Sequence, residues 1–173
     1  MPVPTPRPTS LDQAGATLAK DFSTVLVKAE ILFTKDRRYS VKNLNDNDGV
    51  VKQNTLDYVI GLERTLLDGT LVNFQAFQRW YTDHDSDILY DEFESGVSFF
   101  TQKEFSSRTT AEFLIISSLN RPDWMVRPRI TWDLTGNWQM AVGTDIFGGK
   151  SKGYIAGRFE DSSRVYGQAR YTF

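Results

Sequence analysis

The stretch Val25-Leu26-Val27-Lys28-Ala29-Glu30-Ile31-Leu32-Phe33-Thr34 decides the fold, because apolar side chains occupy every second position along it. Lys28, Glu30 and Thr34 fall between those positions. Successive side chains of a β-strand point to opposite faces, so a period of two predicts a strand with one apolar and one polar face. A helix requires a period of about 3.6, and no segment of useful length in the chain follows it.

The same alternation recurs along the chain. The alternating segments are 25–34, 56–63, 72–80, 93–99, 111–119, 124–134, 138–146 and 165–173. Each is close to the ~9–11 residues with which a tilted strand crosses a bilayer, and about eight strands is an even number, as in single-chain bacterial barrels. We therefore expect an all-β protein, an antiparallel up-and-down transmembrane β-barrel of about eight strands. Gln78 on an apolar face and Pro128 inside a strand depart from the pattern.

The connections between these segments alternate in length. Long connections are expected at 35–54, 82–88, 120–123 and 148–163, and short ones at 67–69, 104–107 and 135–137. Outer-membrane barrels have long extracellular loops at one end and short periplasmic turns at the other. The alternation therefore predicts a membrane orientation as well as a topology.

Composition excludes several classes of function. The formal net charge of −2 and the sequence pI of about 5.4 leave no basic footprint for nucleic acid. The absence of cysteine excludes disulfides, thiolate metal sites and cysteine nucleophiles. No apolar run approaches the ~20 residues of a membrane helix. The mean hydropathy of −0.39 does not argue against a barrel, because alternating strands average to a mildly polar sequence.

Residues 1–15 are predicted to be an extended Pro-rich leader, and residues 16–173 to be the β-barrel domain. Four of the six prolines lie in the first eight residues. This stretch lacks the apolar core of a secretory signal, which a barrel needs for export. The sequence is therefore expected to be a mature chain or part of a longer protein.

Polar side chains alternate with the apolar ones, and an arginine facing lipid near the bilayer midplane would cost ~2–4 kcal/mol. These residues are therefore predicted to line the lumen: Glu30, Asp57, Glu63, Asn73, Gln75, Arg79, Glu112, Arg127, Arg129, Asp133, Asp145 and Arg170. If the strands close alone, such side chains fill a narrow interior. In a larger barrel the same side chains line a pore and set its solute preference.

Aromatic residues near the strand ends predict girdles at the two membrane interfaces. The girdle beside the long connections is expected to contain Trp80, Tyr81, Tyr90 and Trp124. The girdle beside the short turns is expected to contain Trp132, Trp138, Tyr171 and Phe173. The alternative is that these residues are core aromatics of a β-sandwich.

The chain ends in Arg164-Val165-Tyr166-Gly167-Gln168-Ala169-Arg170-Tyr171-Thr172-Phe173. A terminal phenylalanine with an aromatic residue two positions before it resembles the closing-strand signal of Gram-negative outer-membrane proteins. This resemblance implies that the barrel-assembly machinery recognises Tyr171 and Phe173. Segments 15–22, 28–30, 55–58 and 157–173 resemble the C-terminal portion of a proteobacterial outer-membrane β-barrel family of unknown function, whose members are longer. That resemblance implies the last half of a larger barrel and brings no catalytic residues.

Two loop segments resemble functional sites, a catalytic histidine and a calcium loop, but we expect neither site in the protein. His84, the single histidine, lies in Asp83-His84-Asp85-Ser86-Asp87, and a solvated loop histidine is expected rather than a catalytic one, which would need a converging serine and acid. Asn45-Asp46-Asn47-Asp48-Gly49 resembles part of a calcium loop but lacks its acidic first ligand and closing glutamate. A turn-rich external loop is expected there, and no metal or cofactor is expected in the protein.

The sequence thus predicts an integral outer-membrane β-barrel protein of a Gram-negative bacterium, and not an enzyme. Its expected role is that of a passive, porin-like channel or a structural barrel, with outer-membrane lipid, lipopolysaccharide and the barrel-assembly machinery as partners and no nucleic acid. One alternative is a soluble, eight-stranded, lipocalin-like barrel that binds an apolar ligand, which would need apolar residues inside. A second alternative is an outer-membrane lipid-modifying enzyme that uses His84.

Overall fold

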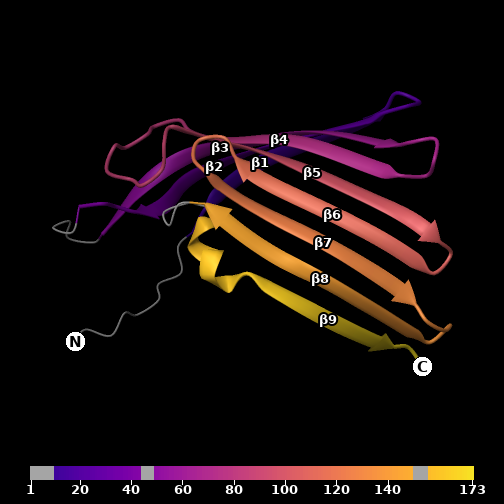
Figure 1. The fold of residues 1–173 in the computed structure, drawn as a ribbon. Helices are drawn as coiled ribbons and strands as arrows, with labels where there is room; N and C mark the ends of the chain where they lie inside the picture. Colours follow the sequence, from indigo (N-terminus) through magenta and orange to yellow (C-terminus); the bar gives the residue numbers. More distant parts are fainter. Residues whose placement is uncertain (1–9, 44–48, 150–155) are drawn as a thin grey trace.

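The computed structural model describes residues 10–43, 49–149 and 156–173, and its strands form one antiparallel sheet (Figure 1). Each strand pairs with its sequence neighbours, so the order in the nine-stranded sheet is the order in the chain. The strands are β1 (Asp12–Asp21), β2 (Leu26–Ser40), β3 (Val50–Thr65), β4 (Leu71–Tyr81), β5 (Phe93–Ser106), β6 (Thr109–Ser118), β7 (Asp123–Asp133), β8 (Trp138–Gly149) and β9 (Arg164–Tyr171). One 3-10 turn, η1 (Gly157–Ser162), precedes β9.

The all-β, up-and-down topology is as predicted, but the strand count is not. The prediction of about eight strands missed β1, which begins at Asp12 and so lies partly within the segment expected to be a leader. The alternation along β1 is weak because Gly15, Ala16 and Ala19 are small and give little contrast between the faces. Residues 1–9 lie outside the described part of the chain.

The sheet is open, and β1 and β9 are its two edges. Figure 1 shows a strongly curved sheet whose first and last strands do not meet. The sequence left two alternatives, a small barrel that closes on itself and the C-terminal part of a larger one, and the open sheet of the described residues does not agree with the first. Each edge strand is paired on one side only: β1 with β2, and β9 with β8.

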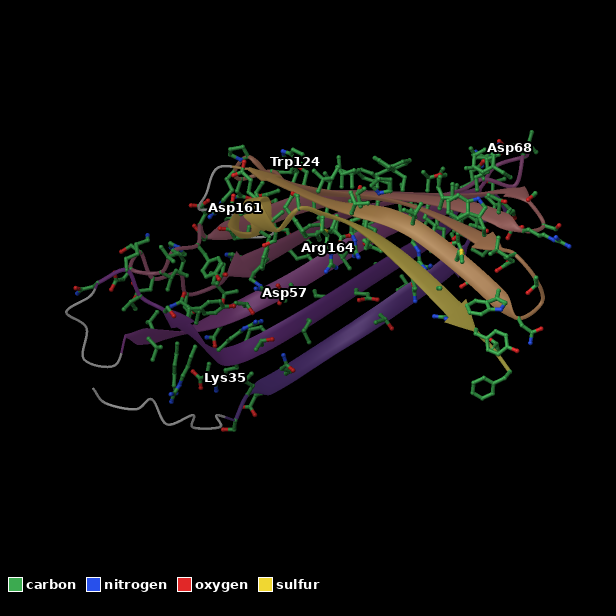
Figure 2. All side chains as sticks on the ribbon, turned by 60° about the horizontal axis from the view of Figure 1, so that its bottom comes forward. Lys35, Asp57, Asp68, Trp124, Asp161 and Arg164 are labelled. Carbon is green, nitrogen blue, oxygen red and sulfur yellow. The ribbon has the colours of Figure 1, made fainter. Side chains whose placement is uncertain are left out.

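The pairing register gives the sheet two chemically different faces. Residues directly opposite each other on neighbouring strands share a face. Asp57 on β3 lies opposite Arg79 on β4, which lies opposite Glu94 on β5, and we call the face that they share the inner face. Ile60 lies opposite Ala76, which lies opposite Val97, on what we call the outer face. Figure 2 shows Asp57 and Arg164 within the curve of the sheet and Trp124 on the opposite side.

A β-bulge in β2 changes which residues point inward near the end of the strand. Thr34 pairs with Thr55, but the next paired residues are Arg37 and Gln53, so β2 has one extra residue there. Asp36 in the bulge has a φ of 57°, as bulges often require. Before the bulge, the even-numbered residues of β2 point to the inner face. After the extra residue, the odd-numbered ones do, so Tyr39 lies on the inner face.

The predicted alternation of connection lengths is present, but the first long connection is shorter than the expected 35–54, because β2 runs to Ser40 and β3 begins at Val50. Short turns at 22–25, 66–70, 107–108 and 134–137 lie at one end of the sheet, which we call the turn end. The strand ends that border the connections 41–49, 82–92, 119–122 and 150–163 lie at the other end, the loop end, and by number of residues all of these connections but 119–122 are long. Leu66–Thr70 closes tightly because Gly69 adopts a φ of 79°, which is favourable for glycine. Within the described residues, no helix is long and apolar enough to cross a membrane.

Candidate functional site: a polar inner wall

Burial in this sheet is the reverse of that in a water-soluble protein. On the inner face, Thr34 and Thr55 are 0% exposed and Asp145 is 1% exposed. On the outer face, Ile60 is 55%, Phe74 46% and Val165 75% exposed. Soluble domains bury large aliphatic residues and leave polar ones in water. The outer face is therefore an extended apolar surface that the described chain leaves uncovered.

The register places every residue predicted to line a lumen on the inner face. These residues are Glu30, Asp57, Glu63, Asn73, Gln75, Arg79, Glu112, Arg127, Arg129, Asp133, Asp145 and Arg170. The inner face also carries apolar residues that the prediction omitted, among them Phe77, Phe100, Leu114 and Ile116. The inner face thus carries these charged groups, but apolar side chains also cover part of it.

Charged groups on the inner face pair along the wall. The Arg79 Nε atom donates to Asp57 Oδ1 over 2.5 Å, from the position directly opposite on the neighbouring strand. Arg121, which follows β6, bridges Glu94 and Asp91, with 2.9 Å between its Nη2 atom and Asp91 Oδ2. Asp57 and Arg79 pair directly across neighbouring strands, so neither side chain has to extend across the concavity to reach an opposite charge.

Glu63 accepts two hydrogen bonds near the turn end. The Lys28 Nζ atom donates to Glu63 Oε2 over 2.9 Å, and Asn73 Nδ2 donates to the same oxygen over 3.0 Å. Lys28 lies opposite Gly61, so the lysine reaches Glu63 diagonally across a residue that has no side chain. A pair at this diagonal spacing is within reach of a long side chain.

Asp145 joins two arginines at the other side of the sheet. Its Oδ1 atom accepts from Arg127 Nε over 2.7 Å, and its Oδ2 atom accepts from Arg164 Nε over 2.8 Å. The carboxylate side chain is 2% exposed, whereas the arginine side chains are 44% and 67% exposed. Arg127, Asp145 and Arg164 belong to three successive strands, so this cluster links β7, β8 and β9 through side chains.

A groove of about 760 Å³ lies in the concavity of the inner face near β1–β5. Its lining includes Glu30, Asp57, Arg79, Tyr81 and Glu94. This set contains three carboxylates and one guanidinium, and within it Asp57 pairs with Arg79, while Glu94 pairs with Arg121. The space is wide enough for water and small solutes, so the side chains of these strands do not fill the concavity.

Large aromatic rings lie flat against the inner wall where glycines are opposite them. Phe77 lies opposite Gly96, and Tyr166 lies opposite Gly143. A Cβ atom added at Gly143 would lie 2.6 Å from the Tyr166 hydroxyl oxygen, and one at Gly96 would overlap the Phe77 ring. The missing side chains therefore let these rings lie along the wall and not project from it.

The outer aromatic residues lie near the two ends, as predicted for six of the eight. Trp80 stacks on Phe93 with ring centroids 5.7 Å apart near the loop end. Trp138, Tyr171 and Phe173 are neighbours at the turn end, with centroid distances of 5.0 Å and 6.3 Å between successive rings. Trp124 and Trp132 belong to the outer face at the loop end and the turn end, respectively.

The placement of Tyr81 and Tyr90 in an outer girdle is wrong. Tyr81 follows Trp80 in one strand, so the two side chains point to opposite faces. Tyr81 is 1% exposed and packs with Tyr39 and Tyr90, at centroid distances of 5.2 Å and 5.6 Å. These tyrosines form an aromatic cluster on the inner side of the loop end.

Gln78, the polar residue on the outer face, has its hydrogen-bonding groups satisfied there. Its amide oxygen accepts from the Tyr58 hydroxyl, and its amide nitrogen donates to Ser95 Oγ. All of them are cross-strand neighbours on β3, β4 and β5. A polar group that is internally hydrogen-bonded costs much less in an apolar environment than an unpaired one.

Asp123 is a functional candidate that the sequence analysis missed. It is 0% exposed at the loop end of β7, and its Oδ1 atom accepts from the backbone N–H groups of Ala156 and Gly157 over 2.7 Å and 2.5 Å. These bonds attach the start of η1 to the wall, and the Phe159 ring packs on Phe147 of the inner face at 5.8 Å. The segment 156–162 is therefore held against the inner face at the loop end of β8.

Asp123→Ala is expected to release this segment. The substitution leaves two buried N–H groups without their acceptor, at a cost of about 1–3 kcal/mol each. The amide protons of Ala156 and Gly157 should then exchange with solvent at least about tenfold faster, as measured by hydrogen-exchange mass spectrometry or NMR. Asp123→Asn keeps an acceptor oxygen and is the matched control. Equal protection in the alanine and asparagine variants would contradict this role.

An ion pair at the turn end has a measurable signature. The Lys103 ammonium, 2.6 Å from Asp68 Oδ2, and the Thr70 backbone N–H together lower the pKa of the Asp68 carboxyl to about 2. The pair is expected to form above the ordinary aspartate pKa of about 3.9 and to be lost as pH falls towards 2. Lys103→Met should raise the pKa of Asp68 towards the ordinary value in an NMR titration of the carboxyl carbon. An unchanged midpoint would show that Lys103 does not contact Asp68 in solution.

His84 is exposed, and its Nε2 atom lies 2.9 Å from the Tyr90 carbonyl oxygen. Its ring meets Tyr81 edge-on at a centroid distance of 6.3 Å. Across the described ranges, no group of three or more metal-ligating side chains gathers in an arrangement that could hold a metal ion. The segment 45–48 of the calcium-like loop lies outside the described residues.

Comparisons with protein-family models, with curated proteins and with solved structures gave no match to this chain. The resemblance to an outer-membrane family of unknown function therefore stays a prediction from sequence. The two faces of the sheet, one polar and one apolar, are the features of the molecule that point to a function.

Proposed function

We propose that this chain forms part of the wall of a β-barrel in the outer membrane of a Gram-negative bacterium, where the barrel acts as a passive channel. The observation that carries the proposal is the reversed burial of the two faces. Residues such as Ile60, Phe74 and Val165 are exposed on the outer face, while charged groups are held on the inner face. Lipid is the environment that accepts an apolar outer face around a polar interior.

The aromatic residues support the same environment. Trp80, Phe93 and Trp124 lie near one end of the outer face, and Trp138 and Tyr171 lie near the other. Aromatic rings with this distribution mark the two interfaces of a membrane-spanning barrel. The long connections then belong to the extracellular side, in contact with lipopolysaccharide, and the short turns to the periplasmic side. Tyr171 and Phe173 remain the proposed contact for the barrel-assembly machinery.

The inner wall favours a channel over a filled interior. Three carboxylates form ion pairs with residues on the neighbouring strand: Asp57 with Arg79, Glu63 with Lys28 and Asp145 with Arg127. These pairs lie along the wall and do not cross the concavity. The flat-lying rings of Phe77 and Tyr166 leave the concavity open, and the groove of about 760 Å³ remains. A lipocalin-like barrel requires apolar residues on the concave side, and here the large exposed apolar surface is on the other side.

Cysteine labelling at two adjacent residues tests the proposal. The chain contains no cysteine, so single substitutions can be labelled without background. In intact outer-membrane vesicles, a charged, water-soluble maleimide should label Glu30→Cys on the inner face and spare Ile31→Cys on the outer face. Both variants should be labelled after denaturation in hot detergent, which controls for intrinsic reactivity.

The outcomes separate the parts of the proposal. Equal labelling of Ile31→Cys and Glu30→Cys in vesicles would show that the outer face meets water, and would overturn the membrane assignment. Protection of both residues would place the chain in lipid but exclude a water-filled interior, and the channel role would fall. Recovery of the protein in the soluble fraction, without detergent, would favour the lipocalin-like alternative.

A further inference from the structure

We infer that the barrel is completed by an odd number of further strands, supplied by a β-segment other than a second copy of this chain, between the edges of β9 and β1. The inference rests on the proposed function, since in lipid both sheet edges must find hydrogen-bonding partners. Every residue of β1 is exposed, and so is every residue of β9 except the half-buried Tyr166. Both edges therefore have room for a neighbouring strand.

The direction of the two edge strands determines whether the number of added strands is odd or even. All pairs in the sheet are antiparallel and follow the chain order, so odd-numbered strands all run the same way. β1 runs from the loop end to the turn end, and so does β9, whose arrow in Figure 1 points to the C-terminus at the turn end. A strand that pairs antiparallel with β9 must run from the turn end to the loop end. A strand that pairs antiparallel with β1 must do the same, so the added segment begins and ends with strands of one direction.

A second copy of the chain does not meet this requirement. Two copies inserted with the same orientation would bring β9 of one beside β1 of the other, and those strands are parallel. Antiparallel contact between two β1 strands, or between two β9 strands, would invert one copy and place its long loops on the periplasmic side. Direct closure of β1 on β9 within one chain is parallel as well. Bacterial barrels are antiparallel with an even strand count, which nine strands plus an odd number provide.

The exposed edges also specify the chemistry of the added segment. β1 presents Ala16 and Leu18 on the outer face, and β9 presents Val165 and Ala169, so the new strands need apolar residues at the matching outward positions. Arg170 on the inner face of β9 lies opposite the neutral Gln139. An acidic residue on the strand next to β9 would complement Arg170, in the same way that Asp57 complements Arg79.

Site-specific photocrosslinking can read the direction of the neighbouring strand. The photoreactive amino acid p-benzoylphenylalanine is placed singly at Ala14, Ala16 or Leu18 on the outer face of β1, in the bacterium that makes the protein. Mass spectrometry then maps the captured residue for each position. Capture of β2 is expected at every position, because β2 is the known antiparallel neighbour of β1. The inference further requires capture of a segment outside β1–β9 whose residue numbers fall as the β1 number rises, which is the signature of antiparallel pairing. The matched control is Ala29 on β2, which must capture β1 or β3 because it lies opposite Leu18 and Ile60.

Each other outcome overturns the inference. Captured numbers that rise with the β1 number would show parallel pairing. Capture of β9 or of another β1 strand would show closure by this chain alone, and capture of β2 alone from the β1 positions would show an unpaired edge. Fractionation of the same cells separates the two claims. A protein that is in the outer membrane but has a parallel or unpaired β1 retains its proposed function, whereas a protein outside the outer membrane loses it.

Discussion

Ile60→Arg is expected to destabilise the protein in lipid by about 2–4 kcal/mol, the cost of an arginine at the midplane of the lipid face of a barrel. Ile60 lies on the outer face midway along the ladder that joins β3 and β4, which runs from Thr55 to Thr65. The free energy should be measured by reversible urea unfolding in lipid vesicles. Because Ile60 is 55% exposed in the described sheet, the same substitution on a water-facing surface would change stability by at most about 0.5 kcal/mol.

Gln75→Arg is the matched control for this substitution. Gln75 lies on β4 opposite Gly61, on the inner face, at nearly the same depth as Ile60. An arginine there can extend into the polar concavity, so the free energy of unfolding should change little. Similar effects of both variants would show that the two faces meet the same environment. The prediction for Ile60 would then be wrong.

Asp145→Ala is expected to cost about 2–3 kcal/mol. Removal of one partner from a fully buried ion pair costs about 3–5 kcal/mol, and the partial exposure of Arg127 and Arg164 reduces this figure. The substitution also leaves two guanidinium groups close together without their shared carboxylate. The loss should be found in urea unfolding of the refolded protein, with early opening of β9.

Two further variants show whether the carboxylate acts through both arginines. Asp145→Asn keeps the size and an acceptor oxygen but removes the charge, so its cost should be intermediate. In the background of Arg164→Gln, the effect of Asp145→Ala should be smaller, because one of the two interactions is already missing. Strictly additive costs would show that Asp145 and Arg164 do not interact in the folded protein.

The period-two alternation was sufficient to predict the existence of strands β2–β9, the antiparallel order, the two ends of different loop length and the face of the charged inner residues. It did not predict the full length of β2 and β3, which extend into the segment 35–54 expected to be a connection. The alternation was sufficient for the rest because adjacent side chains in a strand must point to opposite faces, whatever the tertiary context. The same rule could have corrected the placement of Tyr81, since Trp80 beside it already pointed outward. The resemblance at the C-terminus added an expectation about assembly that the fold does not address.

The features that the sequence analysis missed depend on contacts between distant residues or on local backbone geometry. β1 was missed because small residues hide the alternation. The bulge at Asp36 inserts one residue and reverses the faces, and a pattern read by position cannot anticipate this shift. The role of Asp123 arises from two N–H groups more than 30 residues away in the chain, at Ala156 and Gly157. Open edges are a property of the whole sheet and leave no local signal.

The pairing of Phe77 with Gly96 and of Tyr166 with Gly143 has a consequence for how such a wall could evolve. A ring that lies flat over a glycine covers part of the inner face but takes up little of the interior space. A single exchange of that glycine for a larger residue would turn the ring towards the axis, since the added Cβ atom would occupy its place. In the proposed channel, one substitution would therefore change the width of the interior, while strand number, register and the apolar outer face are retained.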